Sequence, residues 1–300
     1  MKKIAITLLL LLSAFALSAA FDSDVSDDLF YHQEAYKEDM DYLLSALNEA
    51  ETNSDKAAIL WRLSRTQLYL TDEIPENQKK ERIAGYEESE NWADQSLAIE
   101  ESADAYHWKA SAIGRVGQVN GPLNSLSKAK PMRELIEKVQ NTFNADMSDA
   151  WYVLSLLYDQ LPGAPISFGN DNFAISYIRR CVDTQDNVNR LNLTNYLELA
   201  QQLHARGWNA SKRAKELDKM QKNWEKESVP TEKMKYYEGR DGRETTPFYS
   251  ALPLGEFSDK QEAVMVCQYA LAVYSMKENP LPSETAKAES IEAFLSSLTK

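Results

Sequence analysis

The spacing of apolar residues predicts a chain built almost entirely of α-helices. Through most of its length, apolar side chains recur at positions i, i+3, i+4 and i+7, the stripe of a core-facing helix. Strict alternation of apolar and polar residues, which is typical of a half-buried strand, is scarce. Glycine and proline number only ten each, so few positions interrupt these helices. We therefore expect an all-α protein.

Two of the predicted helices begin alike, which indicates an internal repeat. DAYHWKASAIGRVG (104–117) and DAWYVLSLLYDQLP (149–162) both start with Asp-Ala-aromatic, forty-five residues apart. We take the aromatic residue of each motif as the anchor of its helix. The same interval leads forward to a third anchor and, with an adjustment of one residue, backward to a fourth. Four residues beyond each anchor stands a small side chain, which lets a second helix pack closely. The anchors are Leu60, Tyr106, Trp151 and Tyr196, and the small residues are Ser64, Ala110, Ser155 and Ala200.

Each anchored helix is followed by a second helical pattern, so the repeat unit is a helix pair. The second patterns cover residues 85–100, 126–143, 172–183 and 210–224. Pro131 is expected to kink or delay the helix at 126–143. A further helix at 31–51 is expected to cap the N-terminal end. The pattern predicts a solenoid of about four helix pairs with N-terminal and C-terminal capping helices.

The last seventy residues follow a different pattern. Residues 229–257 combine turn signals and aromatic residues without a helical period, whereas 259–279 and 283–300 read as helices. We expect this helical pair to close the far end of the solenoid, and the irregular segment to fold back across its concave surface. The predicted division is a signal peptide (1–20), a helical repeat domain (21–228), and the irregular segment with the C-terminal helical pair (229–300).

The first twenty residues have the three parts of a secretory signal peptide. Lys2 and Lys3 precede an apolar run, and Ser18-Ala19-Ala20 supplies small residues for cleavage. The run is shorter than a typical membrane-spanning helix, and no cysteine stands where a lipoprotein anchor would be attached. We expect a bacterial protein that is periplasmic or secreted, with no stable membrane insertion after cleavage.

The charge and the cysteine content narrow the range of partners. The formal net charge is −13, and it becomes −15 once Lys2 and Lys3 are removed. Such an acidic surface disfavours nucleic acid and anionic lipid, because both bind basic patches. Cys181 and Cys267 are the two cysteines. An oxidising compartment permits a disulfide between them, and two buried thiols are the alternative.

Four segments carry a resemblance to a known family: ILWRLSR, AYHWKASAIGRVGQVNG, DAWYVLSLLYDQLPG and FGNDNFAISYIRR. They resemble a tetratricopeptide-like family of exported bacterial proteins. This family is similar to the regulator of microtubule dynamics proteins and, more distantly, to the T-component of TRAP transporters. The resemblance runs from about Ala57 to Met220 and implies a tetratricopeptide-like solenoid. The segment before Phe168 is shorter than in the family, and the transporter component's lipid-attachment cysteine is missing. The motifs specify packing and therefore a scaffold rather than an activity.

No motif points to catalysis, a cofactor or a metal. The sequence contains no GxSxG, P-loop, GxGxxG or HExxH spacing, and His32, His107 and His204 fall on different predicted elements. We therefore expect no catalytic residue, no cofactor and no metal site, and a protein that is not an enzyme. The loop RDGRETTPFY (240–249) offers Arg240 and Arg243 to an anionic ligand, and a plain connecting loop is the alternative.

The resemblance to tetratricopeptide stacks places a concave groove along the first helix of each pair. Its exposed positions lie one and five residues beyond each anchor, and His204 falls on the same face. The residues expected to contact a partner are Trp61, Arg65, His107, Ser111, Tyr152, Leu156, Leu197, Gln201 and His204. Aromatic and arginine side chains suit peptide recognition. The alternative places Trp61 and Tyr152 in the core and fills the groove with the C-terminal segment.

The sequence thus favours an exported, non-catalytic helical-repeat scaffold that binds a protein or peptide partner in its concave groove. The alternative is a periplasmic accessory component of a TRAP-like solute-uptake system that binds an apolar small molecule. A dry apolar tunnel would favour the alternative, and an open groove of polar and aromatic side chains would favour peptide binding.

Overall fold

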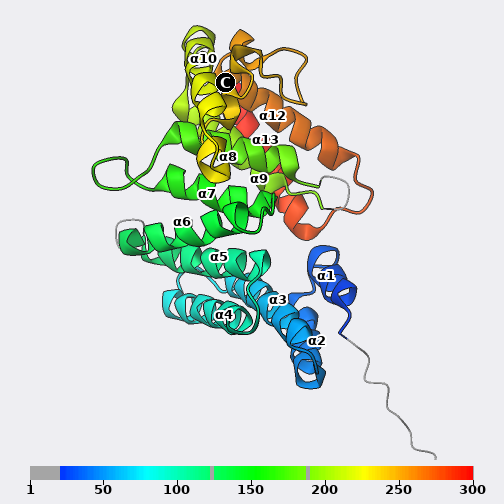
Figure 1. Ribbon diagram of the computed structural model, residues 1–300. Helices are drawn as coiled ribbons and strands as arrows, with labels where there is room; N and C mark the ends of the chain where they lie inside the picture. Colours follow the sequence, from blue (N-terminus) through cyan, green and yellow to red (C-terminus); the bar gives the residue numbers. More distant parts are fainter. Residues whose placement is uncertain (1–20, 122–124, 187–189, 300) are drawn as a thin grey trace, which may run out of the picture.

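The computed structural model describes residues 21–121, 125–186 and 190–299, and the regular elements of these residues are all helical (Figure 1). The predicted signal peptide lies outside the described residues. The α-helices are α1 (Ser23–Tyr31), α2 (Tyr36–Glu49), α3 (Asn53–Asp72), α4 (Lys79–Ile99), α5 (Ala103–Asn120), α6 (Leu126–Asn141), α7 (Ser148–Gln160), α8 (Asp171–Thr184), α9 (Leu193–Arg206), α10 (Ala210–Lys226), α11 (Pro230–Met234), α12 (Asp259–Ser275) and α13 (Pro282–Thr299). Three short 3-10 helices are η2 (Tyr237–Gly239), η3 (Gly242–Glu244) and η4 (Leu254–Glu256).

Consecutive helix pairs stack as the forty-five-residue period predicts. Helix α3 packs on α4, α5 packs between α4 and α6, and α7 packs on α8 (Figure 1). All four anchors are buried, and the small residues four positions beyond them are fully buried. At one of these close contacts, the Ser64 and Ser89 hydroxyl oxygens of α3 and α4 lie 3.2 Å apart. An all-α helical-repeat architecture is therefore confirmed.

Polar side chains fix where several of the helices begin. The Thr52 hydroxyl accepts a hydrogen bond from the Asp55 backbone N–H at 3.0 Å, and Ser102 does the same for Ala105 at 3.2 Å. Such caps satisfy backbone N–H groups that have no partner in the first helical turn. At the other end of a helix, Gly207 takes the left-handed conformation (φ 62°) that stops α9.

The structure differs from the sequence-based prediction at two helices. The helix expected at 31–51 begins only at Tyr36, as α2, and a separate helix, α1, precedes the expected range; between the two the chain turns, with Glu34 at a positive φ of 52°. Pro131 does not delay the helix at 126–143, since α6 begins at Leu126 and continues through the proline. Pro131 is exposed, so its ring lies on the solvent side of α6.

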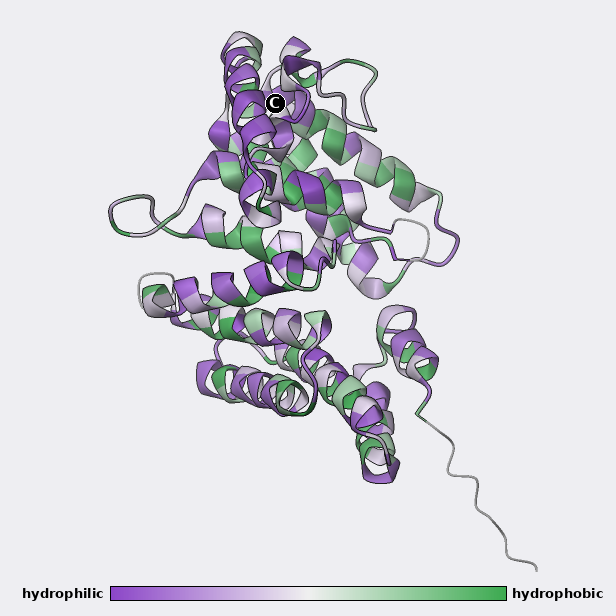
Figure 2. Ribbon diagram, viewed as in Figure 1, coloured by the Kyte–Doolittle hydropathy of each residue, from purple (hydrophilic) through white to green (hydrophobic). Residues whose placement is uncertain are grey.

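The fourth helix pair is arranged differently from the first three. Helix α9 packs on α12 and α13, whereas α10 packs against η2, η3 and η4. The hydropathy of the two helices agrees with this packing: Figure 2 shows apolar residues along α12 and hydrophilic ones along most of α10. The C-terminal helices thus take the place beside α9 that a paired second helix would occupy.

The irregular segment 229–257 lies against the second helices of the repeats. Helix α11 contacts α6 and α8, and the 3-10 helices contact α8 and α10. The segment therefore does not fold back across the concave surface, although this was expected from the sequence. At the opposite ends of the chain, the Ser283 hydroxyl of α13 donates a hydrogen bond to the Glu34 carboxylate after α1, so the two ends meet.

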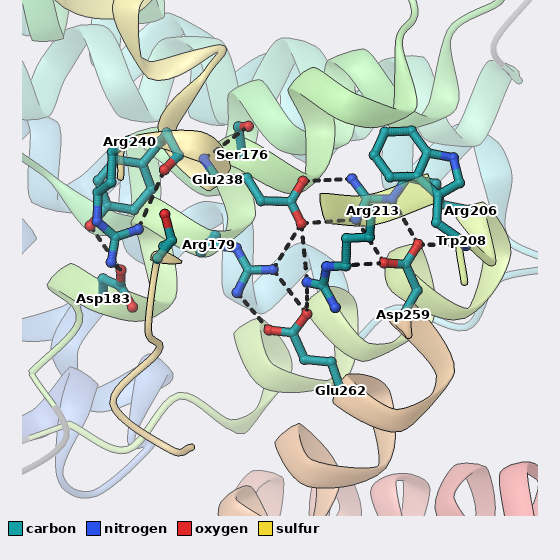
Figure 3. Close-up of polar contacts among 12 residues, drawn as sticks. Ser176, Arg179, Asp183, Arg206, Trp208, Arg213, Glu238, Arg240, Asp259 and Glu262 are labelled. Carbon is teal, nitrogen blue, oxygen red and sulfur yellow. Dashed lines mark hydrogen bonds and ion pairs between the residues drawn. The ribbon is translucent and has the colours of Figure 1, made fainter. Parts of the chain in front are cut away.

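A buried network of charged side chains holds this segment and α12 to the repeats (Figure 3). Arg179 donates hydrogen bonds to Glu262 at 2.6 Å and to Glu238 at 3.1 Å. Arg206 binds Glu238 at 2.6 Å and Asp259 at 2.8 Å. Arg213 bonds to Glu238 and Glu262 as well. Three arginines thus face three carboxylates, and the cluster is balanced in charge, with all six side chains buried.

The two cysteines are both buried as free thiols. Cys181 lies on α8 and Cys267 on α12, and both belong to the main apolar core. The structure therefore has the two-thiol alternative rather than the disulfide.

Candidate functional site

Two adjoining pockets form a groove along the first helices of the repeats. The aromatic pocket, of about 220 Å³, lies among α3, α5, α6, α7 and the start of α9. The acidic pocket, of about 320 Å³, lies between the end of α1, the first turns of α5 and α7, residues 184–186 and residues 190–195. The two pockets share His107, Trp108, Asp149, Arg190, Asn192 and Asn195, so they form one groove.

The two pockets differ in chemistry. The wall of the aromatic pocket includes Leu68, Tyr69, Trp108, Ile113, Met132, Tyr152, Val153, Leu156 and Leu157, with Arg115 and Lys128 among the polar residues of its wall. The acidic pocket is lined by Tyr31, Asp104, Asp146 and Asp186 beside the shared residues, which include Asp149. The groove therefore offers an apolar surface next to a region rich in carboxylates.

Four of the nine residues expected to contact a partner lie in this groove. His107, Ser111, Tyr152 and Leu156 line the aromatic pocket, and His107 lines the acidic pocket as well. They come from α5 and α7, at positions one and five beyond the anchors Tyr106 and Trp151. The middle two repeats thus bring their expected groove positions together. The other five expected residues line neither pocket: Trp61, Arg65, Leu197, Gln201 and His204.

Arg65 lies outside both pockets because α1 and α2 cover it, and Trp61 packs against an apolar cluster of α3, α4 and α5. Arg65 is fully buried and donates hydrogen bonds to the Asp27 carboxylate at 2.6 Å and to the Ser26 hydroxyl at 3.0 Å. Trp61 is half-buried, with the Arg62 guanidinium 4.1 Å from its ring centroid. The expected exposed face of the first repeat is thus used to hold the N-terminal helices.

Leu197, Gln201 and His204 lie on α9, which α12 and α13 cover. Leu197 is part of the main apolar core. His204 is exposed, and its ring centroid lies 5.8 Å from that of Phe294 on α13. Gln201 is exposed but away from the two pockets. The fourth repeat therefore adds only the first residues of α9, not its middle, to the groove.

Several residues of the groove were missed by the sequence-based prediction. Continuing the i+4 series by one turn, to nine residues beyond the anchors, gives Tyr69, Arg115 and Gln160, and all three line the aromatic pocket. Stepping three residues back from the first position gives Asp104 and Asp149, which start the two Asp-Ala-aromatic motifs and line the acidic pocket. Arg190 has no such signal, because it lies outside the repeated helices.

Opposite charges and burial set the electrostatics of the groove. The Arg190 guanidinium lies 2.9 Å from the Asp149 carboxylate and 4.4 Å from the centroid of the Tyr31 ring. Burial disfavours the charged form of Asp149, but Arg190 outweighs it and lowers the pKa of that carboxyl. Burial lowers the pKa of His107 to about 4. His107 is therefore a neutral imidazole at pH 7.

The arginines of the loop 240–249 are both engaged within the protein. Arg243 forms an ion pair with Asp218 of α10, and Arg240 lies 3.5 Å from the Asp183 carboxylate. The connecting-loop alternative thus describes this segment. In the described part of the chain, no three side chains of His, Cys, Asp or Glu are grouped to hold a metal ion. None of the described helices combines the length and the apolar character needed to cross a bilayer.

A comparison with protein families bears on the N-terminal part of the groove. The family model described as Regulator of microtubule dynamics protein 1-3 matches residues 24–157, which extend from α1 into α7. No curated protein matches the chain. The matched region contains α3, α5 and most of α7, three of the helices that line the groove. Over these residues, the chain is similar to the regulator of microtubule dynamics protein family.

Proposed function

We propose that the protein is an exported, non-catalytic helical-repeat scaffold that binds an extended segment of a partner protein in its groove. The observation that carries the proposal is the convergence of α3, α5 and α7 on one groove, where Tyr69, Trp108 and Tyr152 lie beside charged side chains. Aromatic residues supply much of the anchoring energy in protein interfaces. Stacked helix pairs offer a preformed surface, which suits an extended segment.

Export is part of this proposal and rests on the sequence. Two lysines, an apolar run and small residues occupy the first twenty positions in the order that a secretory signal requires. The partner would then be a protein of the periplasm or of the cell exterior. The acidic net charge of −13 makes nucleic acid an unsuitable partner.

The proposal is tested by selecting binders from a displayed library of random twelve-residue peptides on the purified protein. Tyr152→Ala is expected to weaken the selected peptides at least about tenfold, because the half-exposed ring is lost from the aromatic pocket. Trp224→Ala is the control, since it removes a half-buried aromatic residue of α10 outside both pockets. Equal affinity of wild type and Tyr152→Ala for every selected peptide would reject the groove as the binding site.

One observation favours a second candidate, an accessory component of a TRAP-like solute-uptake system. The aliphatic side chains of Leu68, Ile113, Met132 and Val153 line the aromatic pocket and suit an apolar small molecule. Native mass spectrometry of the protein purified from its own compartment distinguishes the two candidates. A bound small molecule that Val153→Trp displaces would support the solute-uptake function over peptide binding.

A further inference from the structure

The acidic pocket has more negative than positive charge among its lining residues. Asp104, Asp146, Asp149 and Asp186 face a single cation of the lining, Arg190. Three of these carboxylates already have a partner within the protein: Asp149 pairs with Arg190 at 2.9 Å, Asp146 pairs with Arg180, and Asp186 has an interaction of its own. The charge that these pairs leave over can attract a cation from outside the protein.

Asp104 is the carboxylate with the strongest need for such a partner. It stands at the start of α5, half-buried, and no lysine or arginine of the described residues lies within ion-pair distance of it. Burial raises the pKa of this carboxyl above its ordinary value, and it outweighs the opposite effect of Arg62 and Arg65, which do not form an ion pair with Asp104. A ligand cation at this position would offset the free energy that it costs to bury the charged form of Asp104.

His107 indicates independently of Asp104 that a ligand could add a hydrogen-bond donor to the pocket. Only 3% of this residue is exposed, its ring lines both pockets, and its Nδ1 has no hydrogen-bond partner among the described residues. A buried polar atom without a partner is rare in a folded protein. The neutral imidazole has one nitrogen that accepts a hydrogen bond, so a donor such as an ammonium or guanidinium group suits it.

We propose that the acidic pocket binds the side chain of a lysine or arginine in the partner segment, while a neighbouring apolar residue of that segment fills the aromatic pocket. This inference rests on the proposed function and adds the chemistry of the segment. Asp104 would pair with the cation and His107 would accept a hydrogen bond from it. Since the two pockets share Trp108, His107 and Asp149, one short segment can reach both.

The test uses the peptides selected from the random library. We expect a basic residue to be enriched close to an aromatic or aliphatic one. In one such peptide, replacing the basic residue with norleucine removes the charge and keeps an aliphatic chain. This peptide is expected to bind wild type about tenfold more weakly than its parent and to bind Asp104→Asn as well as its parent does. Asp41→Asn, an equal charge change on the exposed face of α2, should leave the tenfold difference intact.

Two outcomes would overturn the inference, and they differ in what they say about the groove. Peptides that depend on Tyr152 but show no preference for a basic residue would keep the proposed function and reject the acidic pocket as its cation site. A library that yields no peptide dependent on Tyr152 would reject both. An unchanged difference between parent and norleucine peptides on Asp104→Asn would place the cation elsewhere.

Discussion

His107 is the one buried residue among the three histidines, all of which lie in the described part of the chain. It stands one position beyond the anchor Tyr106, where the repeat pattern expects an exposed side chain. Its ring instead lies beside Trp108, with the centroids 4.8 Å apart, and forms part of the wall of both pockets. Asp149 of α7 and Arg190 line the same pockets and act on its charge, so its chemistry depends on neighbours far away in the sequence.

The depressed pKa of His107 predicts how stability changes with pH. Its pKa is about 4 when folded and close to 6.5 when unfolded, so between these values the unfolded chain binds more protons. The free energy of unfolding should therefore fall as pH drops from 6.5 to 4, by about 3 kcal/mol at most from this residue. Urea denaturation of wild type and His107→Phe across this range measures it.

The quantity to compare between the two proteins is how steeply the free energy of unfolding changes with pH, not its absolute value. His107→Phe keeps a ring of similar size but cannot be protonated, so its stability should depend less on pH than that of wild type. Parallel curves for the two proteins would show that His107 is not the group that titrates.

At the scale of the helix, residues four positions apart share one face, and this spacing determines which side chains lie in the core and which line the groove. The anchor and the small residue four positions on are buried, whereas residues one, five and nine beyond the anchor share another face. In α5 these are His107, Ser111 and Arg115, and all three line the aromatic pocket. The same period thus places the core and the groove on different sides of one helix.

Enlarging a small residue should test this register on a single helix. Ala200 of α9 is fully buried, whereas Ala205 on the same helix is exposed. Ala200→Leu is expected to destabilise the protein by roughly 1–3 kcal/mol, because the closely packed helices cannot make room for the larger side chain. Ala205→Leu, the same change on the solvent side, should leave the stability within a few tenths of that of wild type. Thermal or urea unfolding of both variants compares them directly.

At the scale of the whole molecule, the buried network ties distant segments together. Arg179 of α8, Arg213 of α10, Glu238 of η2 and Glu262 of α12 bond to one another (Figure 3). The pKa of Glu262 is lowered to about 2, because Arg179 and Arg213 outweigh the effect of burial. Glu262 therefore stays ionised, and the charges of the cluster balance only when every member is in place.

Removing one charge from this network should weaken the C-terminal half. Glu262→Gln is expected to cost about 3–5 kcal/mol, because it leaves Arg179 and Arg213 buried with too little negative charge. Glu256→Gln, an exposed carboxylate of η4, is the matched control and should change little. Hydrogen exchange would locate the effect, with faster exchange in residues 229–257 and α12 than in α3 and α4. Uniform loss of protection would indicate that the network stabilises the whole chain equally.

Much of the fold could be predicted from local pattern. The spacing of Leu60, Tyr106, Trp151 and Tyr196 indicates which face of each helix is buried. The small residues four positions after them indicate where two helices approach closely. The repeat carries this information because each helix pair contacts mainly its neighbours. By the same means the groove positions of α5 and α7 were found.

The sequence by itself determined an all-α helical repeat and which side of α5 and α7 forms the surface of the groove, since both depend on residues a few positions apart. Only the tertiary structure decided how much of that surface stays open. Helices α1 and α2 cover Arg65, and α12 and α13 cover Leu197, through contacts between segments far apart in the chain. Such contacts have no period, so the repeat gives no sign of them, and they confine the groove to the middle of the solenoid.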